Sequence, residues 1–160
     1  MIDIQDYEGI YKFDLEILQV YSIKNNIYLK NVLTDKGYYV VCLYKNKKGK
    51  NIFIHRICYK CNNPTEDLTG IELDHIDGNP LNNKIENLRK ATRSQNCSNT
   101  KIQKNNKLGI KNIVESRQGY RFELTQNGIR YNKRFDNLQD AIEYRDKFVL
   151  EKCGEFTNLG

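Results

Sequence analysis

The chain has 160 residues, 29% of them charged, and a formal net charge of +6 at pH 7. This length allows one ordinary domain or two or three small modules. No apolar run approaches the roughly 18 residues that a membrane span needs, and the opening MIDIQD lacks the basic and apolar segments of a secretory signal. We therefore expect a cytoplasmic protein of phage, viral or bacterial type, neither secreted nor bound to a membrane.

The five cysteines are odd in number and lack the spacing of a disulfide framework, which predicts reduced thiols. Cys58 and Cys61 form a Cys-x-x-Cys pair, which is half of a tetrahedral zinc site. No second pair of ligands closes that site, so we do not expect a structural zinc. The alternative is that both thiols pack as small apolar groups one helical turn apart.

The first predicted module spans residues 1–62. Runs of β-branched and aromatic residues at 18–23, 27–33, 38–44 and 51–55 alternate with turn residues at Asn25-Asn26, Asp35-Lys36-Gly37 and Lys48-Gly49. The pattern predicts a small antiparallel sheet, followed by a short helix over 54–62. We expect His55 to anchor the sheet to this helix, and the alternative is that it touches DNA or the functional site.

The second predicted module, residues 63–105, has a strand at 71–74, a long loop, and a strand at 87–91. A helix is predicted from about Arg93, because Thr92 and Gln95 have the spacing of a capping box. The polar stretch 101–107 is interpreted as a linker.

The third predicted module spans residues 106–160. Strands are predicted at 109–115, 120–126 and 129–135, with Gln118-Gly119 and Asn127-Gly128 as the turns. Apolar residues at helical spacing from Leu138 to Val149 predict a helix with Asn137 as its N-cap. The fold class is α+β, and this last module is a three-stranded sheet packed on one helix.

The positive charge is concentrated in the middle of the chain. Residues 81–111 hold eight basic side chains and one acidic side chain, whereas residues 1–80 have a net charge of −1 and residues 112–160 are neutral. Clustered cations bind polyanions by releasing condensed counterions. The candidate DNA contacts here are Arg89, Lys90, Arg93, Lys101 and Lys104. The alternative is a solvated basic helix.

Residues 73–89 read LDHIDGNPLNNKIENLR, and RSQN follows at 93–96. About thirty residues, with Asp-His, Asp-Gly-Asn, Asn-Leu-Arg and a helical Asn in order, resemble the core of the HNH nuclease family, in the subgroup found in phage and intron homing endonucleases. The resemblance implies a ββα-metal fold, in which a hairpin and a helix surround one divalent cation.

The same resemblance implies that Asp74 and Asn96 are metal ligands, that His75 is the general base, and that Asn87 is the catalytic-centre residue that steadies the loop. The chemistry agrees, because phosphodiester cleavage needs a base with a near-neutral pKa and a cation to offset phosphate charge. Hard oxygen ligands suit Mg²⁺ or Mn²⁺, and no small-molecule cofactor is expected. Asp77 is either a turn former, which we favour, or a further ligand.

Asp74 and His75 present a geometric problem. Neighbouring side chains point to opposite faces of a regular strand, yet both must serve one reaction centre. Either the strand ends at Asp74 or a bulge re-aims one side chain.

The flanking segments carry two further resemblances. Residues 6–61, through Tyr7-Glu8-Gly9-Ile10-Tyr11 and Ile54-His55-Arg56, resemble the nuclease-associated modular segment that precedes such cores. Residues 108–160 resemble the Apetala-type (ethylene-response-factor) DNA-binding domain. The alternation along its strands turns Phe122 and Leu124 toward the helix. The DNA contacts expected of this domain are Arg117, Arg121, Arg130, Asn132 and Arg134, and the alternative is a solvated basic sheet.

These features favour a site-preferring, metal-dependent HNH endonuclease that works as a monomer on double-stranded DNA. Whether it nicks one strand or cuts both is left open. The alternative from another class is a non-catalytic DNA-binding protein with a relic HNH scaffold, and an RNA-directed nuclease is a third, weaker reading.

Overall fold

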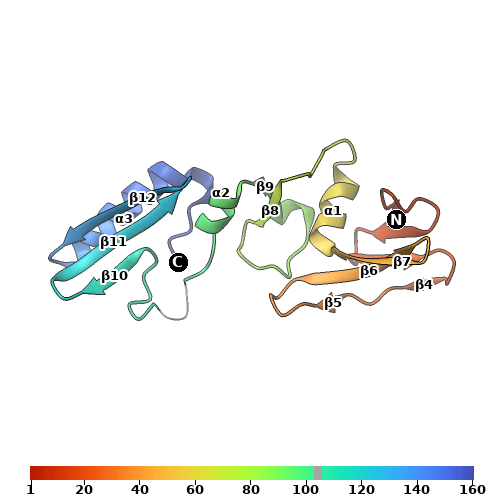
Figure 1. The fold of residues 1–160 in the computed structure, drawn as a ribbon, viewed down its shortest axis with the longest axis horizontal. Helices are drawn as coiled ribbons and strands as arrows, with labels where there is room; N and C mark the ends of the chain where they lie inside the picture. Colours follow the sequence, from red (N-terminus) through yellow and green to blue (C-terminus); the bar gives the residue numbers. More distant parts are fainter. Residues whose placement is uncertain (103–105) are drawn as a thin grey trace. The chain divides into compact units, whose positions relative to one another are not determined.

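A computed structural model describes residues 1–102 and 106–160 (Figure 1). The chain divides into two compact units, Met1–Lys90 and Ala91–Gly160, and each is described by itself. Among the described residues, no helix has the length and apolar character to cross a membrane.

The first unit opens with two antiparallel sheets. One has the order β1 (Ile2–Asp3), β2 (Tyr11–Asp14), β3 (Gln19–Ser22) and β4 (Ile27–Tyr28), and the other has the order β5 (Val32–Leu33), β6 (Tyr39–Lys45) and β7 (Lys48–Phe53). The prediction of a single small sheet is therefore wrong. The run 27–33 is divided between the sheets, because Leu29 N donates to Val20 O at 2.7 Å while Val32 already pairs with β6.

The predicted turn at Lys48-Gly49 is also wrong, since both residues lie in β7. The turn is made by Asn46 and Lys47, whose φ angles of 53° and 63° are those that a two-residue hairpin turn requires. The ring of the exposed Tyr44 rests on Gly49, where a Cβ would lie 2.9 Å from a ring carbon.

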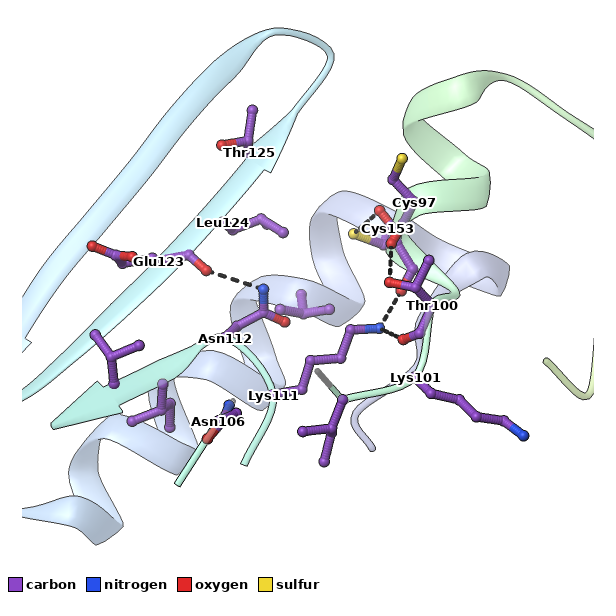
Figure 2. A pocket seen from close by; sticks show the side chains of 15 residues that line it. Cys97, Thr100, Lys101, Asn106, Lys111, Asn112, Glu123, Leu124, Thr125 and Cys153 are labelled. Carbon is purple, nitrogen blue, oxygen red and sulfur yellow. Dashed lines mark hydrogen bonds between the residues drawn. The ribbon is translucent and has the colours of Figure 1, made fainter. Parts of the chain in front are cut away.

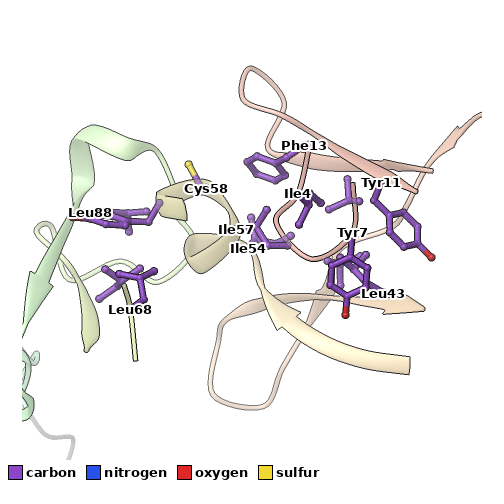
Figure 3. Packing of buried hydrophobic residues seen from close by; sticks show 14 residues of the cluster. Ile4, Tyr7, Tyr11, Phe13, Leu43, Ile54, Ile57, Cys58, Leu68 and Leu88 are labelled. Carbon is purple, nitrogen blue, oxygen red and sulfur yellow. The ribbon is translucent and has the colours of Figure 1, made fainter. Parts of the chain in front are cut away.

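Helix α1 (Ile54–Asn62), at the predicted place, lies at the centre of the core of the first unit (Figure 3). Ile54, Ile57 and Cys58 are fully or almost fully buried, and they belong to one apolar cluster with Phe13 from β2 and Leu88. This cluster joins the N-terminal sheets to the segment that carries the HNH-like motif.

That segment forms β8 (Glu72–His75), a 3₁₀ turn η1 (Ile85–Asn87) and β9 (Leu88–Ala91), with β8 and β9 paired. The helix α2 (Arg93–Ser98) follows and starts where it was predicted to start. Its capping box is confirmed: Gln95 N donates to Thr92 Oγ1 at 3.2 Å, and Thr92 N donates to Gln95 Oε1 at 2.8 Å. The division between the compact units at residues 90 and 91 lies within the module predicted over 63–105, whose boundaries stay a prediction.

The second unit also contains the three-stranded sheet β10 (Ile113–Ser116), β11 (Gly119–Gln126) and β12 (Ile129–Phe135), with α3 (Leu138–Cys153) and a final 3₁₀ turn η2 (Gly154–Phe156). Phe122 and Leu124 are buried, and the ring of Phe122 lies 5.5 Å from that of Tyr144 on α3. The predicted sheet backed by one helix is present. β10 starts later than expected, because Asn112 adopts a positive φ of 63°.

Candidate active site

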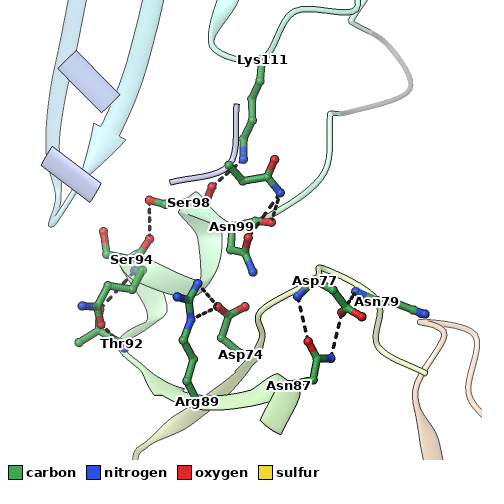
Figure 4. Close-up of polar contacts among 12 residues, drawn as sticks. Asp74, Asp77, Asn79, Asn87, Arg89, Thr92, Ser94, Ser98, Asn99 and Lys111 are labelled. Carbon is green, nitrogen blue, oxygen red and sulfur yellow. Dashed lines mark hydrogen bonds and ion pairs between the residues drawn. The ribbon is translucent and has the colours of Figure 1, made fainter. Parts of the chain in front are cut away.

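Asp74 is a buried carboxylate whose charge is compensated within the first unit. It is 3% exposed, and its Oδ2 lies 2.9 Å from Nε and 2.8 Å from an Nη of Arg89 on β9 (Figure 4). A desolvated carboxylate needs such a partner, because removing the cation would leave an uncompensated buried charge. The guanidinium of Arg89 thus contacts Asp74, and its predicted contact with DNA stays a prediction.

His75 ends β8, so the strand runs one residue further than the predicted end at Asp74. His75 is 5% exposed, and its Nε2 lies 3.1 Å from Oδ1 of Asn83. The Asn83 amide is oriented by its Nδ2, which donates to Leu81 O at 3.3 Å. Because an amide oxygen can only accept, this contact assigns the imidazole proton to Nε2 and the basic lone pair to Nδ1.

The favoured sequence interpretation missed both side chains that orient His75. The signal for Asn83 was its place in the Asn82-Asn83 pair of the motif. For His55 the favoured prediction is an anchor between sheet and helix, but its ring centroid lies 5.2 Å from that of His75, as the alternative prediction has it. The rings of Phe53 and Tyr38 lie 5.3 Å and 5.6 Å from His55, so an aromatic wall covers this side of His75.

His55 is 8% exposed, and its Nδ1 has no hydrogen-bond partner among the residues that the structure describes. Burial lowers its pKa from 6.5 to about 3, and electrostatic interactions with His75 and Arg56 act in the same direction. His55 is therefore neutral at pH 7 and adds no charge beside His75.

Asn87 joins the two ends of the loop between β8 and β9 (Figure 4). Its Oδ1 accepts from Asp77 N at 3.0 Å, and its Nδ2 donates to Asp77 Oδ1 at 2.9 Å and to Asn82 O at 2.8 Å. The carboxylate of Asp77 also accepts from Asn79 N at 2.8 Å. Burial alone would raise the pKa of Asp77, but hydrogen bonds from Asn82, Asn79 and Asn87 outweigh it and lower the pKa. These contacts are those of a turn former.

The donor atoms fit a hard divalent cation. Among the described residues, no group of three or more His, Cys, Asp and Glu side chains could hold a metal ion. One carboxylate with an amide oxygen would leave positions for water and phosphate, which is how Mg²⁺ is usually bound. Asp74 belongs to the first unit and Asn96, half-buried on α2, to the second, so the joint role of Asp74 and Asn96 stays a prediction.

The Cys58 and Cys61 thiols pack in the apolar cluster of the first unit. Burial raises the pKa of each to about 11, so without a metal ion both thiols stay protonated at pH 7.

The predicted DNA contacts near α2 differ in their surroundings. Lys90 Nζ lies 2.9 Å from Glu66 Oε2, whereas Arg93 and Lys101 are exposed on the surface of the second unit. Lys104 lies outside the described residues.

The predicted contacts on the C-terminal sheet share its open face. β11 and β12 place Arg121 opposite Arg134, Glu123 opposite Asn132, and Thr125 opposite Arg130. Arg121 Nε and an Nη of Arg130 lie 2.7 Å and 3.4 Å from Glu123 Oε1. Arg117, in the turn before β11, is exposed.

Comparison with known proteins places the chain among nucleases. A family model described as HNH endonuclease matches residues 53–97. Protein 3.8 of Escherichia phage T7 is 36% identical over 92 residues, which are 56% of this chain and 76% of that protein. The chain belongs to the HNH endonuclease family.

Two relatives that are named as endonucleases show over how much of its length the chain matches known nucleases. The DNA endonuclease I-HmuI of Bacillus phage SP01 is 38% identical over 99 residues, which are 61% of this chain and 55% of that protein. The H-N-H endonuclease F-TflII of Escherichia phage T5 is 30% identical over 92 residues, which are 57% of this chain and 48% of that protein. The chain thus spans about half the length of each of these two endonucleases.

A solved structure, titled DNA binding and cleavage by the HNH homing endonuclease I-HmuI, has a TM-score of 0.55 and 28% sequence identity to this chain. The match covers 94% of this chain and 89% of that one. The mixture of small antiparallel sheets and few helices is therefore that of an HNH homing endonuclease.

Proposed function

We propose that this HNH protein is a metal-dependent endonuclease that hydrolyses phosphodiester bonds in double-stranded DNA, with a preference for particular sites. The observation that carries the proposal is the buried pair at the end of β8. Asp74 is ion-paired with Arg89, and the imidazole Nε2 of the next residue, His75, donates to Asn83. A relic scaffold has no chemical reason to keep a base and a ligand in this state.

His75 is the proposed general base. With Nε2 donating to Asn83 Oδ1, Nδ1 takes the proton of the attacking water. Asn83 and the aromatic wall hold the ring, so its lone pair keeps one direction during the reaction.

Asp74 and Asn96 are the proposed ligands of one Mg²⁺ or Mn²⁺ ion, which when bound offsets the charge that develops on the scissile phosphate. Arg89 keeps the Asp74 carboxylate in place through Oδ2. Asn87 keeps the intervening loop closed through Asp77 and Asn82. Together these roles constitute a ββα-metal centre over residues 71–99.

Two flanking modules are proposed to bind the DNA on either side. Residues 1–62 are assigned as the nuclease-associated module and residues 106–160 as an Apetala-type domain. Support for the second comes from the register that sets Arg121 directly opposite Arg134. Like charges in that position destabilise a sheet, and phosphate or guanine contacts would offset the cost. The proposed contacts on this domain are Arg117, Arg121, Arg130, Asn132 and Arg134.

The basic residues around α2, namely Arg89, Lys90, Arg93, Lys101 and Lys104, are proposed to follow the phosphate backbone. We further infer an intracellular protein that acts as a monomer.

The test is cleavage of supercoiled plasmid by the wild-type protein and by His75→Ala, each with Mg²⁺ and with EDTA. Wild-type protein should convert plasmid to open circle only with Mg²⁺, and His75→Ala should lose at least about 100-fold in rate while DNA binding changes little. Lys36→Ala, at an exposed turn, serves as the matched control. Magnesium-dependent cleavage by His75→Ala at the wild-type rate would rule out the assigned base.

A plasmid that carries no preferred site would hide the activity, so a library of genomic fragments is cut in parallel and its ends are sequenced. Salt-sensitive binding without any cleavage of the library would instead support the non-catalytic DNA-binding alternative.

A further inference from the structure

The helix α2 has six residues, too few to be stable without contacts outside itself. On one side it is held by a single side-chain oxygen of β11. Gln126 Oε1 accepts from Ser98 Oγ at 2.9 Å and from Ser94 Oγ at 3.1 Å, and Asn127 N donates to Ser94 Oγ at 2.8 Å. The two serines are four residues apart, so they lie on one face of the helix.

Gln126 occupies a position where the strand pattern calls for an apolar residue. It follows Phe122 and Leu124 on the same face of β11, and like them it is buried, with 7% of its surface exposed. A buried amide in an apolar row needs hydrogen-bond partners, because an unpaired polar group there is destabilising. The serines of α2 supply those partners.

The end of α2 is held from the same unit (Figure 2). Lys111 Nζ donates to Ser98 O at 2.6 Å and also to Thr100 O, and Asn158 Nδ2 donates to Asn99 O at 2.9 Å. These donors satisfy carbonyl groups that the last turn of a helix leaves unpaired. The helix is therefore built into the C-terminal sheet and tail of the second unit.

The position of Asn96 follows from this anchoring. Asn96 is two residues from each serine, and two residues correspond to about 200° of helix rotation. The face that carries Asn96 is thus turned away from the face that Gln126 holds. A rotation or slide of α2 about the Gln126 contact would move Asn96 directly.

We propose that Gln126 is a positioning residue for DNA cleavage, which fixes the rotation of α2 and so the direction in which Asn96 is presented to the metal ion. The inference rests on the proposed function. It gives the C-terminal sheet a role in holding α2, in addition to its proposed role as a surface for DNA.

The test compares Gln126→Met, which keeps the length of the side chain without an acceptor, with Gln126→Glu, which keeps the acceptor oxygens. The measurements are cleavage rate, the Mg²⁺ concentration for half-maximal cleavage, DNA binding in EDTA, and thermal unfolding. Gln139→Met, on the exposed face of α3, is the matched control. We expect Gln126→Met to need roughly 10-fold more Mg²⁺ or to lose roughly 10-fold in rate, as outer partners of metal ligands do. DNA binding should change by less than about 3-fold in both variants. Gln126→Glu keeps the acceptor but buries a carboxylate, so it should melt at a lower temperature, while its Mg²⁺ dependence stays nearer to the wild type than that of Gln126→Met.

A triple variant, Ser94→Ala with Ser98→Ala and Gln126→Met, separates positioning from simple stability. Removing all three polar side chains leaves Asn127 N, which is exposed to water, and the weak thiol donor of Cys153 without their serine partners. Most of the loss in melting temperature should therefore be recovered. Cleavage should stay low if the hydrogen bonds position α2, and recovery of cleavage together with stability would overturn the proposal. Wild-type rate and Mg²⁺ dependence in Gln126→Met would overturn it as well. A wild-type chain that binds DNA but never cleaves it would instead reject the proposed function, and the inference with it.

Discussion

His75 depends for its orientation on two residues that are distant from it along the chain. Asn83 Oδ1 accepts a hydrogen bond from Nε2 of His75, and the ring of His55, at the start of α1, contacts the ring of His75. Neither contact adds charge, because Asn83 is neutral and burial keeps His55 unprotonated. The surroundings of His75 are thus set by packing and by one hydrogen bond.

The depressed pKa of His55 makes the stability of the first unit depend on pH. The folded pKa of about 3 lies below the unfolded value of 6.5, so the unfolded chain binds the proton first as the pH falls. This contribution is complete above pH 6.5 and is lost progressively between pH 6.5 and about 3. In the wild type the loss should be about 1.4 kcal/mol for each pH unit below 6.5.

His55→Phe keeps a ring beside His75 and removes the titrating nitrogens. The free energy of unfolding, measured with urea, should fall between pH 7.0 and pH 5.5 by about 1 kcal/mol less in His55→Phe than in the wild type. An equal pH dependence in the two proteins would show that His55 is not buried as a neutral ring.

The motif predicted Asp74, His75 and Asn87 because it is continuous in the sequence, and the structure brings Asp74 and His75 to the buried end of β8. It could not predict His55 or the pairing of Arg89 with Asp74. Those contacts depend on where α1 and β9 pack, and a sequence pattern of 17 residues carries no information on that packing.

At the level of elements, local chemistry was predictable and sheet membership was not. The capping box of α2 and the Asn127-Gly128 turn are local signals, and the structure has both. The run 27–33 looks like one strand, yet it divides between two sheets because long-range hydrogen bonds outweigh its β propensity. Lys48-Gly49 looks like a turn, but both residues lie in β7, where the ring of Tyr44 rests on the glycine.

The loop between β8 and β9 is held closed by side-chain hydrogen bonds and not by strand pairing. Asn87 makes three of them. Asn87→Ala should therefore lower the free energy of unfolding by roughly 1–3 kcal/mol, since it removes three partly buried hydrogen bonds. Cleavage should fall further than the loss of folded protein explains, because the loop carries Asn83 against His75. Denaturant unfolding and single-turnover cleavage on the same preparation measure the two effects.

Lys84→Ala is the control for Asn87→Ala, because Lys84 is exposed in the same loop. It should leave unfolding within about 0.5 kcal/mol of the wild type. If Asn87→Ala cleaves at the wild-type rate, then the loop does not need this side chain to hold His75.

At the scale of the whole molecule, the formal net charge of +6 makes DNA binding depend on salt. On the C-terminal sheet, an acidic side chain offsets part of the positive charge. Glu123 lies within ion-pair distance of both Arg121 and Arg130. The side chain of Arg130 is 68% exposed, so it can leave Glu123 for a phosphate at little cost. An acidic residue at the centre of a basic face weakens non-specific attraction while leaving the arginines available for a matching site.

Arg130→Ala should weaken DNA binding, because it removes a cation. Glu123→Gln should strengthen DNA binding, because it frees Arg121 and Arg130 from their ion pairs with Glu123. We expect Arg130→Ala to bind about 3- to 10-fold more weakly at low salt and to reduce the slope of log affinity against log salt by about 1. Fluorescence anisotropy over a salt series in EDTA gives both quantities.

The Mg²⁺ concentration for half-maximal cleavage should not change in Arg130→Ala, whose guanidinium has no part in holding α2. Weaker binding by Glu123→Gln would mean that Glu123 itself faces the DNA bases, and an unchanged salt slope in Arg130→Ala would remove this face of the sheet from the DNA interface.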